Sequence, residues 1–372
     1  MNKIHLIAFN VPFPADYGGV IDIFYKVKAF RECGVKVILH CFEYGRHRSA
    51  ILNDICEKVF YYPRSKGPFY LLDTLPYIVS TRISSELTER LLKDNYPILF
   101  EGLHTTACMK EIAAIKKKRK MVVRTHNIEH DYYRGLMNAE GSLPRKLYYY
   151  SEANKLKRYE KVLNYAGGVA AISKADYNYF SNLYDHVHYI PAFHPYNEVD
   201  IQTGYGTYAL FHGNLSVPEN KKAVLYLIEE VFKDMDYPFV IAGKEPGHEI
   251  LKAAEVNNHI KVVSNPGEEE MDKLIRHAHI NVLATFQATG IKLKLLSSLF
   301  RGRHCLVNPV MVEDTGLAVL CHVAHSGAEF RTMLEQLKEK EFQQEDIDGR
   351  KKHLEEELSN IKNAQKLATM LF

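Results

Sequence analysis

Hydrophobic residues along this chain alternate between short continuous runs and stretches with helical spacing. The mostly apolar runs Ile4–Phe9, Ile98–Leu103 and Ile280–Leu283 predict buried strands. Between such runs, apolar residues recur every three or four positions, as in Val20–Cys33, and this spacing indicates amphipathic helices. Strands that alternate with helices in this way predict an α/β fold with parallel sheets.

The most informative pattern follows one of these strands. Ile280–Leu283 leads into a loop that ends at Gly290, and a helical pattern then runs to Gly302. A helix that starts after a glycine loop offers free backbone N–H groups and the positive end of its dipole, which suits a phosphate. Lys292 and Lys294 fall in the first turn, where a cation is unfavourable for the helix itself. The pattern fits either an anion-binding site or an ordinary βαβ unit with two solvated lysines.

Composition indicates a globular chain of two domains. Its 372 residues are 46% hydrophobic and 25% charged, which excludes a disordered polymer. The six cysteines form no CxxC pair, so we expect reduced thiols rather than disulfides or a zinc cluster. The apolar N-terminal stretch is too short for a signal peptide, and no run reaches membrane-spanning length. We therefore expect a cytoplasmic protein.

Charge is unevenly distributed. Residues 1–200 hold 28 Lys and Arg against 21 Asp and Glu, whereas residues 201–372 hold 20 against 24. A basic N-terminal half is attracted to an anionic surface, either a membrane or a nucleic acid. The basic cluster Lys116–Lys120 and the long amphipathic helix predicted at Leu147–Tyr165 both fit ordinary solvated surface, with membrane contact as the alternative.

Two metal-like patterns also occur. His126, Glu129 and His130 spell H-x-x-E-H, which in some zinc peptidases lies on one helix. Here His126 directly follows a predicted strand, so we do not expect both imidazoles to share a helix, and we predict no zinc. Asp234-x-Asp236 mimics a metal-binding DxD pattern, but it lies between a helix and the start of a strand, and we predict no metal there either.

Three segments, taken in order, resemble the family 4-like glycosyltransferases. Gly290–Gly302, G-I-K-L-K-L-L-S-S-L-F-R-G, resembles the segment G-x-[RK]-x-K-x-x-E-A-x-x-x-G of that family. Pro12–Gly19 resembles its P-x-P-x-x-x-G-G opening, and His126–Glu129 resembles its H-N-x-E motif. The resemblance spans Pro12 to Asn308 and implies the GT-B fold, in which two doubly wound Rossmann-like α/β domains face each other across a cleft.

Domain boundaries follow from the pattern and the resemblance together. Phe193–Gly206 is rich in Pro, Asn, Asp and Gly and has no apolar periodicity, which is typical of a linker. We therefore expect an acceptor-side domain over residues 1–195 and a nucleotide-sugar donor domain over residues 206–345. By analogy with GT-B proteins, a C-terminal helix over residues 350–372 is expected to pack back on the first domain.

The resemblance also implies an activity. A hexosyltransferase-type enzyme would move a sugar from a GDP- or UDP-sugar to a hydroxyl of a glycan or lipid-linked acceptor, with retention of configuration. The setting would be bacterial-type synthesis of a cell-surface polysaccharide or glycolipid, in the cytoplasm or peripherally on the inner face of the membrane. Neither a cofactor, a metal ion nor a nucleic-acid partner is implied.

Residue roles carry over at the matching positions. The catalytic residues would be His126, near the sugar, and Lys294, at the diphosphate. The acceptor-side residues would be Glu101, Asn127 and Glu129. The donor-binding residues would be Gly18, Gly19, Gly213, Asn214, Lys221 (or Lys222 in the neighbouring register), Thr289, Gly290, Ile291, Lys292 and Ser297.

The chain departs from the family at two positions. The family carries two glutamates with seven residues between them, and this chain has Thr289 and Ser297 at those positions. Hydroxyl groups can still hydrogen-bond a ribose or a sugar, but less strongly than carboxylates do. Two alternatives therefore remain: a non-catalytic nucleotide-sugar-binding GT-B scaffold subunit, and another GT-B reaction such as epimerisation of a sugar nucleotide.

Overall fold

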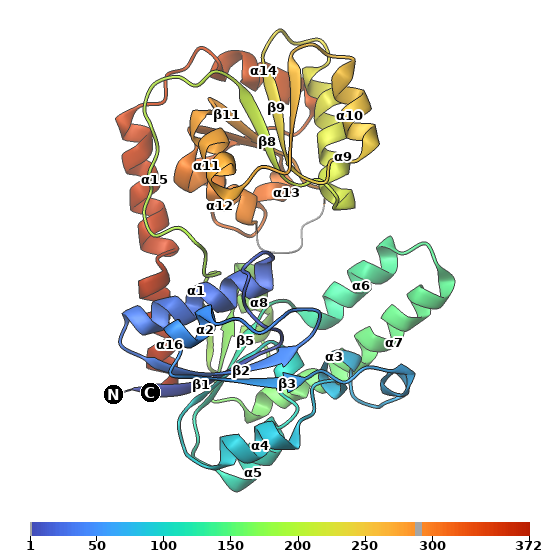
Figure 1. The fold of residues 1–372 in the computed structure, drawn as a ribbon, viewed down its shortest axis with the longest axis vertical. Coiled ribbons are helices and arrows are strands. Elements are labelled where there is room, and N and C mark those ends of the chain that lie inside the picture. Colours follow the sequence, from blue (N-terminus) through green and yellow to red (C-terminus); the bar gives the residue numbers. More distant parts are fainter. Residues whose placement is uncertain (1, 287–291) are drawn as a thin grey trace. The chain divides into compact units, whose positions relative to one another are not determined.

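The computed structural model describes residues 2–286 and 292–372. The chain divides into two compact units. The first runs to Pro195 and also includes Leu358–Phe372, and the second comprises Tyr196–Glu357 (Figure 1). Each unit has its own hydrophobic core.

A seven-stranded parallel sheet forms the centre of the first unit, in the order β3-β2-β1-β4-β5-β6-β7. Its strands are β1 Lys3–Ala8, β2 Lys36–Glu43, β3 Lys58–Pro63, β4 Ile98–Glu101, β5 Met121–Thr125, β6 Gly168–Ala171 and β7 Val187–Tyr189. The direction of the strand order reverses between β1 and β4. In doubly wound sheets, ligands bind at the carboxyl ends of the strands beside such a reversal.

Helices cover both faces of this sheet, as their apolar stripes require. They are α1 Gly18–Glu32, α2 Ile51–Ile55, α3 Tyr77–Ser80, α4 Ser85–Leu92, α5 Met109–Ile115, α6 Glu129–Ala139, α7 Leu143–Tyr159, α8 Lys174–Ser181 and α16 Asn360–Leu371, with 3-10 turns η1 Pro68–Leu71, η2 Leu103–Thr105 and η3 Glu160–Tyr165. Phe30 of α1 and Leu367 of α16 share one core with β1 and β2. Ile112 of α5 and Leu156 of α7 belong to the core on the other face.

The second unit has a six-stranded parallel sheet in the order β10-β9-β8-β11-β12-β13, which reverses between β8 and β11. Its strands are β8 Ala209–Asn214, β9 Phe239–Lys244, β10 Ile260–Ser264, β11 Ile280–Leu283, β12 His304–Val307 and β13 His322–Val323. Its helices are α9 Pro218–Tyr226, the π-helix η4 Leu227–Phe232, α10 His248–Glu255, α11 Glu268–His277, α12 Leu293–Arg301, α13 Pro309–Val312, the 3-10 turn η5 Ala318–Leu320, α14 Gly327–Leu337 and α15 Gln344–Glu357. The predicted α/β class with two doubly wound domains is confirmed.

One expected element differs. The sequence predicts a single terminal helix that packs on the first domain, but the structure has two helices, α15 and α16, which belong to different units. Ser359 interrupts the helix because its side chain accepts a hydrogen bond from Lys362 N and so caps α16. Arg350 holds α15 on the second unit, where its guanidinium donates to the carbonyls of Gly302 and Arg303. Helix α16 packs against α1.

The segment predicted as a linker belongs largely to the second unit, which begins at Tyr196. The Tyr196 ring stacks on Phe300 with the ring centroids 5.2 Å apart. The Asp200 carboxylate pairs with Arg276 at 2.8 Å and with Arg301 at 2.9 Å. Because of these contacts, a stretch without apolar periodicity is nevertheless held against a folded unit.

Candidate functional site

Two helices begin beside the reversal in the second sheet. Helix α9 follows β8, and α12 follows β11, which is the neighbour of β8 in the sheet. Neither helix has a side-chain cap at its N-terminus among the described residues. No described side chain therefore caps the first-turn N–H groups of these two helices, and the positive ends of both helix dipoles favour an anion.

Lys294 lies in the first turn of α12 and connects to α9. Its ammonium donates a hydrogen bond to Asn220 Oδ1 at 2.7 Å and lies 5.2 Å from the centre of the Phe211 ring. Burial lowers the pKa of Lys294 to about 8, although the nearby Glu219 carboxylate opposes this shift. Burial also lowers the pKa of Lys292, the N-cap residue of α12. Two desolvated lysines at a helix start form a site suited to an anion.

Asn220 was not predicted, yet it organises this site. Its side-chain amide donates to the Asn214 carbonyl at 2.8 Å, and its oxygen accepts from Lys294. A Cβ at Gly213 would lie 3.3 Å from this amide nitrogen, so glycine leaves room for it. The Asn214 side chain, predicted to bind the donor, instead accepts from Ser216 N at 3.0 Å and from Ser216 Oγ at 2.7 Å.

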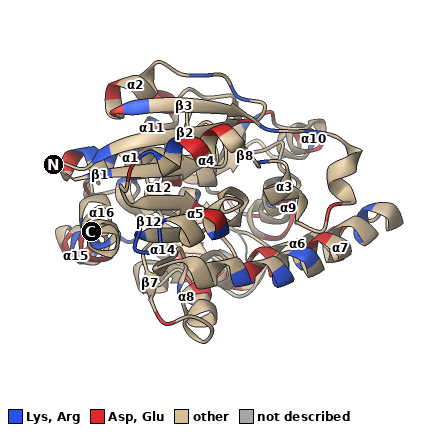
Figure 2. Cartoon of the chain, turned by 90° about the horizontal axis from the view of Figure 1, so that it is seen from below, with Lys and Arg blue, Asp and Glu red and all other residues tan. Residues whose placement is uncertain are grey.

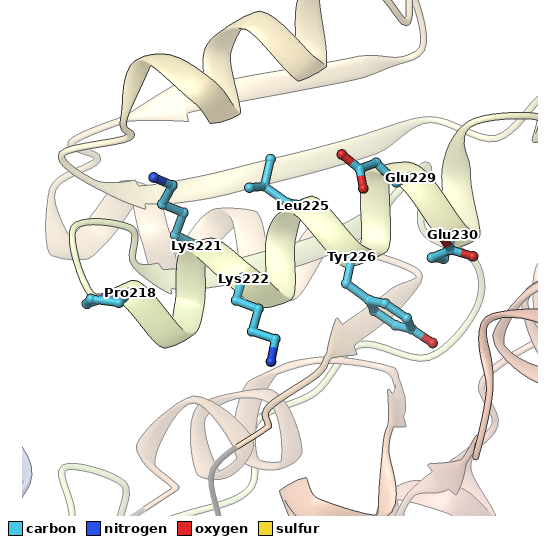
Figure 3. Close-up of a pocket in the computed structure, with 7 residues that line it drawn as sticks. All are labelled: Pro218, Lys221, Lys222, Leu225, Tyr226, Glu229 and Glu230. Carbon is cyan, nitrogen blue, oxygen red and sulfur yellow. The ribbon is translucent and has the colours of Figure 1, made fainter. Parts of the chain in front are cut away.

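The two neighbouring lysines of α9 point in different directions (Figure 3). Lys221 pairs with Glu249 of α10 at 2.5 Å, and its side chain is 37% exposed. The Lys222 ammonium lies 4.8 Å from the centre of the Phe286 ring. Phe286 belongs to the loop that follows β11. The prediction named Lys222 as the alternative to Lys221, in the neighbouring register. Lys222 is the one of the two that lies beside this loop. Both line a surface hollow along α9 with Pro218, Leu225, Tyr226, Glu229 and Glu230.

The loop after β11 is fixed at its start. Thr285 donates its hydroxyl hydrogen to Glu219 Oε1. Asn308, which follows β12, accepts from Thr285 N at 3.0 Å and donates to the Thr285 carbonyl at 2.6 Å. The predicted donor-binding residues Thr289, Gly290 and Ile291 lie outside the described residues.

Ser297, predicted to bind the ribose, is a buried residue of α12. Its hydroxyl donates to the Lys294 carbonyl at 2.9 Å, within its own helix. The next residue, Ser298, is also buried and lies 3.0 Å from His212 Nε2. Burial lowers the pKa of His212 to about 3, so its imidazole is neutral. The ribose-binding role of Ser297 stays a prediction, with its hydroxyl already bonded.

The first unit contains a network of buried charges that was not predicted as a whole. The Lys26 ammonium, on α1, lies 2.8 Å from Asp22 Oδ2 and 2.7 and 2.8 Å from the two carboxylate oxygens of Glu101. Arg124 of β5 donates to Asp22 Oδ1 at 3.0 Å. His126 Nε2 lies 2.9 Å from Glu101 Oε2. This network attaches His126 to the end of β4 and to α1.

The same network bears on cation binding. Asp22, Glu101 and His126 offer oxygen and nitrogen atoms within 4.8 Å of one another, which is close enough to hold a metal ion. The Lys26 ammonium already lies within 2.8 Å of three of the carboxylate oxygens. Lys26 therefore supplies the positive charge that a cation would supply there. Arg124 and Lys26 together balance the two buried carboxylates.

Unsatisfied polar atoms gather at the carboxyl ends of β4 and β5. His104 Nδ1, Thr125 Oγ1, His126 Nδ1 and Glu129 Oε1 are buried and have no hydrogen-bond partner among the described residues. His104 Nδ1 and Glu129 Oε1 are 3.9 Å apart, too far for a direct hydrogen bond. Burial, followed by the Asp176 carboxylate, raises the pKa of Glu129 to about 8, so the side chain is mostly protonated at neutral pH. Buried polar atoms without partners indicate a place where a ligand or water bonds.

The other residues predicted for this unit lie around the same strand ends. A Cβ at Gly19 would lie 2.7 Å from the Phe9 ring, so glycine lets α1 begin against this ring. Gly18 is the first residue of α1. Phe9 in turn contacts His126, with ring centroids 5.3 Å apart. Asn127 lies between β5 and α6 and hydrogen-bonds Glu129.

Each unit thus brings part of the predicted set together. Strand ends in the first unit hold His126, Glu101 and Glu129, and helix starts in the second unit hold Lys292 and Lys294. The missed residues are Asp22, Lys26, His104, Arg124 and Asn220. Asp22 and Lys26 gave one signal, since charges of opposite sign four residues apart meet on one helix face.

Among the described residues, no helix combines the length and the apolar character needed to cross a bilayer. No family model matches the chain. An uncharacterised 44.6 kDa protein from the cps region of Klebsiella pneumoniae is 27% identical over 337 residues, which cover 85% of each protein.

Solved structures with the same fold cover the whole chain. UGT89C1 of Arabidopsis thaliana, in complex with UDP-L-rhamnose, superposes with a TM-score of 0.60 at 14% identity, over 100% of this chain and 99% of its own. TarM superposes with a TM-score of 0.67 at 11% identity, and MurG of Acinetobacter baumannii with a TM-score of 0.52 at 10% identity. Both matches cover 100% of this chain and 99% of the other chain. The predicted fold is confirmed: this chain has the GT-B fold of glycosyltransferases.

Proposed function

We propose that this protein transfers a sugar from a nucleoside-diphosphate sugar, GDP- or UDP-linked, to a hydroxyl group of a glycan or lipid-linked acceptor. The observation that carries the proposal is the part-buried ammonium of Lys294, which lies where α9 and α12 begin at the reversal of the second sheet. A desolvated cation beside two uncapped helix N-termini favours a ligand with concentrated negative charge, as a diphosphate has. The GT-B neighbours crystallised with UDP or UDP-L-rhamnose support the nucleotide part of the proposal.

The chemistry asked of this site is stabilisation of a leaving group. When the bond between the anomeric carbon and the phosphate oxygen breaks, its electrons stay on the diphosphate. Lys292, Lys294 and the first N–H groups of α12 would neutralise that charge, as preorganised dipoles and cations do in other enzymes. In this proposal the two lysines supply the positive charge, and no cofactor takes part.

We assign acceptor binding to the strand ends of the first unit. The unpartnered atoms of His104, Thr125, His126 and Glu129 could exchange hydrogen bonds with sugar hydroxyls. Protonated Glu129 can donate, and a neutral imidazole can accept. In this arrangement the Nε2–H group of His126 donates to Glu101, and His126 Nδ1 is the atom that accepts a hydrogen bond.

The relative and the resemblance both support a setting for this reaction. The protein of Klebsiella pneumoniae comes from a cps, or capsule, region and shares most of its length with this chain. We therefore place the reaction in the synthesis of a surface polysaccharide, on the cytoplasmic side of the membrane, with retention of configuration as in family 4.

A second candidate is a non-catalytic subunit that binds a nucleotide sugar. It is favoured by Ser297, which stands where the family has a glutamate and whose hydroxyl is bonded within its own helix. Binding of a nucleotide sugar without release of a nucleoside diphosphate would support this candidate.

An assay of nucleoside-diphosphate release separates the two. The protein is incubated with UDP- and GDP-sugars and an acceptor fraction of lipids and glycans, and a linked product is analysed by NMR for the configuration of the new bond. We expect release and a retained anomer, a large loss in Lys294→Met and an unchanged rate in Lys221→Met. His126→Ala should lower turnover far more than nucleotide affinity. No turnover with any donor, despite binding, would reject the enzymatic function.

A further inference from the structure

Helix α7 exposes an apolar stripe that its role in the core does not explain. Ala153 and Leu156 are buried on one side of the helix and belong to the core of the first unit. On another side, Leu143, Leu147 and Tyr150 are spaced four and three residues apart and are 68%, 61% and 59% exposed. Residues with this spacing share one helix face. Three large apolar side chains therefore protrude together from the first two turns.

The same face becomes basic further along the helix. Lys157 and Arg158 lie seven and eight residues after Tyr150 and are both exposed. The one acidic residue in the sequence of α7, Glu152, is only 1% exposed, and its carboxylate pairs with Lys155 at 2.9 Å. The solvent-facing side of α7 thus carries positive charge and no exposed carboxylate.

The hairpin of α6 and α7 places this face at the periphery of the first unit. In Figure 1 the two helices project beyond the sheet as a pair, and in Figure 2 several of their turns carry Lys and Arg. At the tip, the Glu140 carboxylate accepts from Gly141 N and Ser142 N at 2.9 and 3.0 Å. These two hydrogen bonds within the turn partly stabilise the negative charge of Glu140.

A second exposed apolar element is attached to the same helix. Lys155 Nζ donates to the carbonyl of Leu71 at 2.9 Å, which holds the η1 turn beside α7. Phe69 and Leu72 of this segment are 84% and 86% exposed. Exposed aromatic and leucine side chains next to basic residues are typical of helices and loops that lie in a membrane interface.

We infer that α7, with the η1 turn beside it, is a docking surface for the anionic surface of a lipid bilayer. The apolar side chains protrude together from one helix face, and a fluid acyl layer accepts such side chains without a matching recess. The exposed Lys157 and Arg158 complement acidic headgroups, because their long side chains can reach the headgroup layer. This inference does not depend on the proposed sugar transfer, since lipid binding is measured without substrate.

Vesicle flotation tests the surface with the full-length protein. We expect binding to vesicles of mixed phosphatidylcholine and phosphatidylglycerol, weak binding to phosphatidylcholine alone, and release at high salt. Leu143→Ser/Leu147→Ser should weaken partitioning by roughly tenfold or more. The matched control, Ile83→Ser/Leu183→Ser, changes two other exposed residues of the same unit and should bind like the wild type.

The charge contribution has its own control. Lys157→Glu/Arg158→Glu should weaken binding by roughly fivefold or more for each residue changed. Lys116→Glu/Lys117→Glu makes the same charge change in the separate basic cluster between α5 and β5 and should have a much smaller effect. An equal loss in both pairs would show a general charge effect and would overturn the assignment to α7.

The absence of tryptophan from the chain allows a direct probe. Tyr150→Trp places a single tryptophan on the stripe, and its emission should shift to the blue and be quenched by brominated lipids. Tyr177→Trp, on α8, should show neither change. No vesicle binding, no quenching at position 150, or an apolar stripe that instead drives self-association would each overturn the inference.

Discussion

The ammonium of Lys294 donates a 2.7 Å hydrogen bond to the side-chain oxygen of Asn220 and so joins the first turns of α12 and α9. Asn220 is neutral, so this contact satisfies a donor of the lysine but does not balance its charge. The Glu219 carboxylate favours the charged form of Lys294 and so opposes the lowering of its pKa by burial, and Glu219 Oε1 also accepts a hydrogen bond from the Thr285 hydroxyl. In this arrangement a bound anion would balance the remaining positive charge.

Replacement of Lys294 by Met should stabilise the ligand-free protein, because it removes a part-buried, desolvated charge at similar side-chain volume. We expect the free energy of unfolding to rise by about 1 to 3 kcal/mol at neutral pH. The pKa of Lys294 is about 8 in the folded protein and close to 10.5 when unfolded. The unfolded chain therefore binds more protons between these values, so wild-type stability rises with pH there and the advantage of Lys294→Met shrinks.

Chemical denaturation at several pH values measures this effect. Lys221→Met serves as the control, because Lys221 is part-exposed and paired with Glu249. A lower free energy of unfolding for Lys294→Met than for the wild type at neutral pH would mean that Lys294 has a structural role in the ligand-free fold.

Nucleotide affinity should also depend on the protonation of Lys294. Since the pKa of this lysine is about 8, the charged form is lost as the pH rises above that value. Affinity for a nucleoside diphosphate should then fall by roughly tenfold per pH unit at the steepest. Lys294→Arg keeps its charge at high pH and should flatten the profile. An identical pH profile for both proteins would assign the dependence to another group.

Lys26 should be essential to the stability of the first unit. Its ammonium is fully buried and contacts Asp22 and Glu101, so Lys26→Met leaves two carboxylates balanced by Arg124 alone. We expect a loss of about 3 to 5 kcal/mol in the free energy of unfolding. Lys28→Met, two residues along the same helix, is the control and should have a small effect. Equal stability of both variants would show that the buried network contributes little.

Glu129 should make stability depend on pH in the opposite direction to an ordinary carboxylate. Its folded pKa is about 8, above the unfolded value near 4.5, so the folded protein holds a proton that the unfolded chain releases. The stabilisation is fully present below about pH 4.5 and is lost as the pH rises through about 8. Glu129→Gln mimics the protonated form and removes this dependence.

The variant should gain on the order of a few kcal/mol over the wild type between about pH 5 and about pH 8. Urea denaturation of both proteins at these two pH values measures the gain. A difference that does not change with pH would place the Glu129 pKa in its usual range.

Most strands were accessible from the sequence, because a short continuous apolar run between turn residues is typical of a strand buried on both faces. Ile280–Leu283 is predicted with its observed bounds, and the helix after it ends at Gly302 as expected. The terminal helix was predicted as one element because its apolar spacing continues past Ser359. The interruption depends on a single hydroxyl that caps α16, and periodicity does not reveal that contact.

Site residues were less accessible than the fold. Lys292 and Lys294 could be predicted because they follow a glycine loop. The direction of the Lys221 side chain depends instead on its ion pair with Glu249, some 28 residues away, and nothing in the sequence marks Glu249 as its partner. Lys26 fits a solvated helix face until β4 places Glu101 beside it. Such residues are recruited by the tertiary fold, so one sequence cannot identify them.

We propose that a nucleoside diphosphate binds the second unit at Lys294. Titration calorimetry with UDP and GDP, on the wild type, Lys294→Met and Lys221→Met, tests it most directly. We predict that the wild type binds at least one of the two, that Lys294→Met binds it roughly tenfold or more weakly, and that Lys221→Met binds like the wild type. Binding of neither nucleotide by the wild type, or equal affinity in Lys294→Met, would contradict the claim.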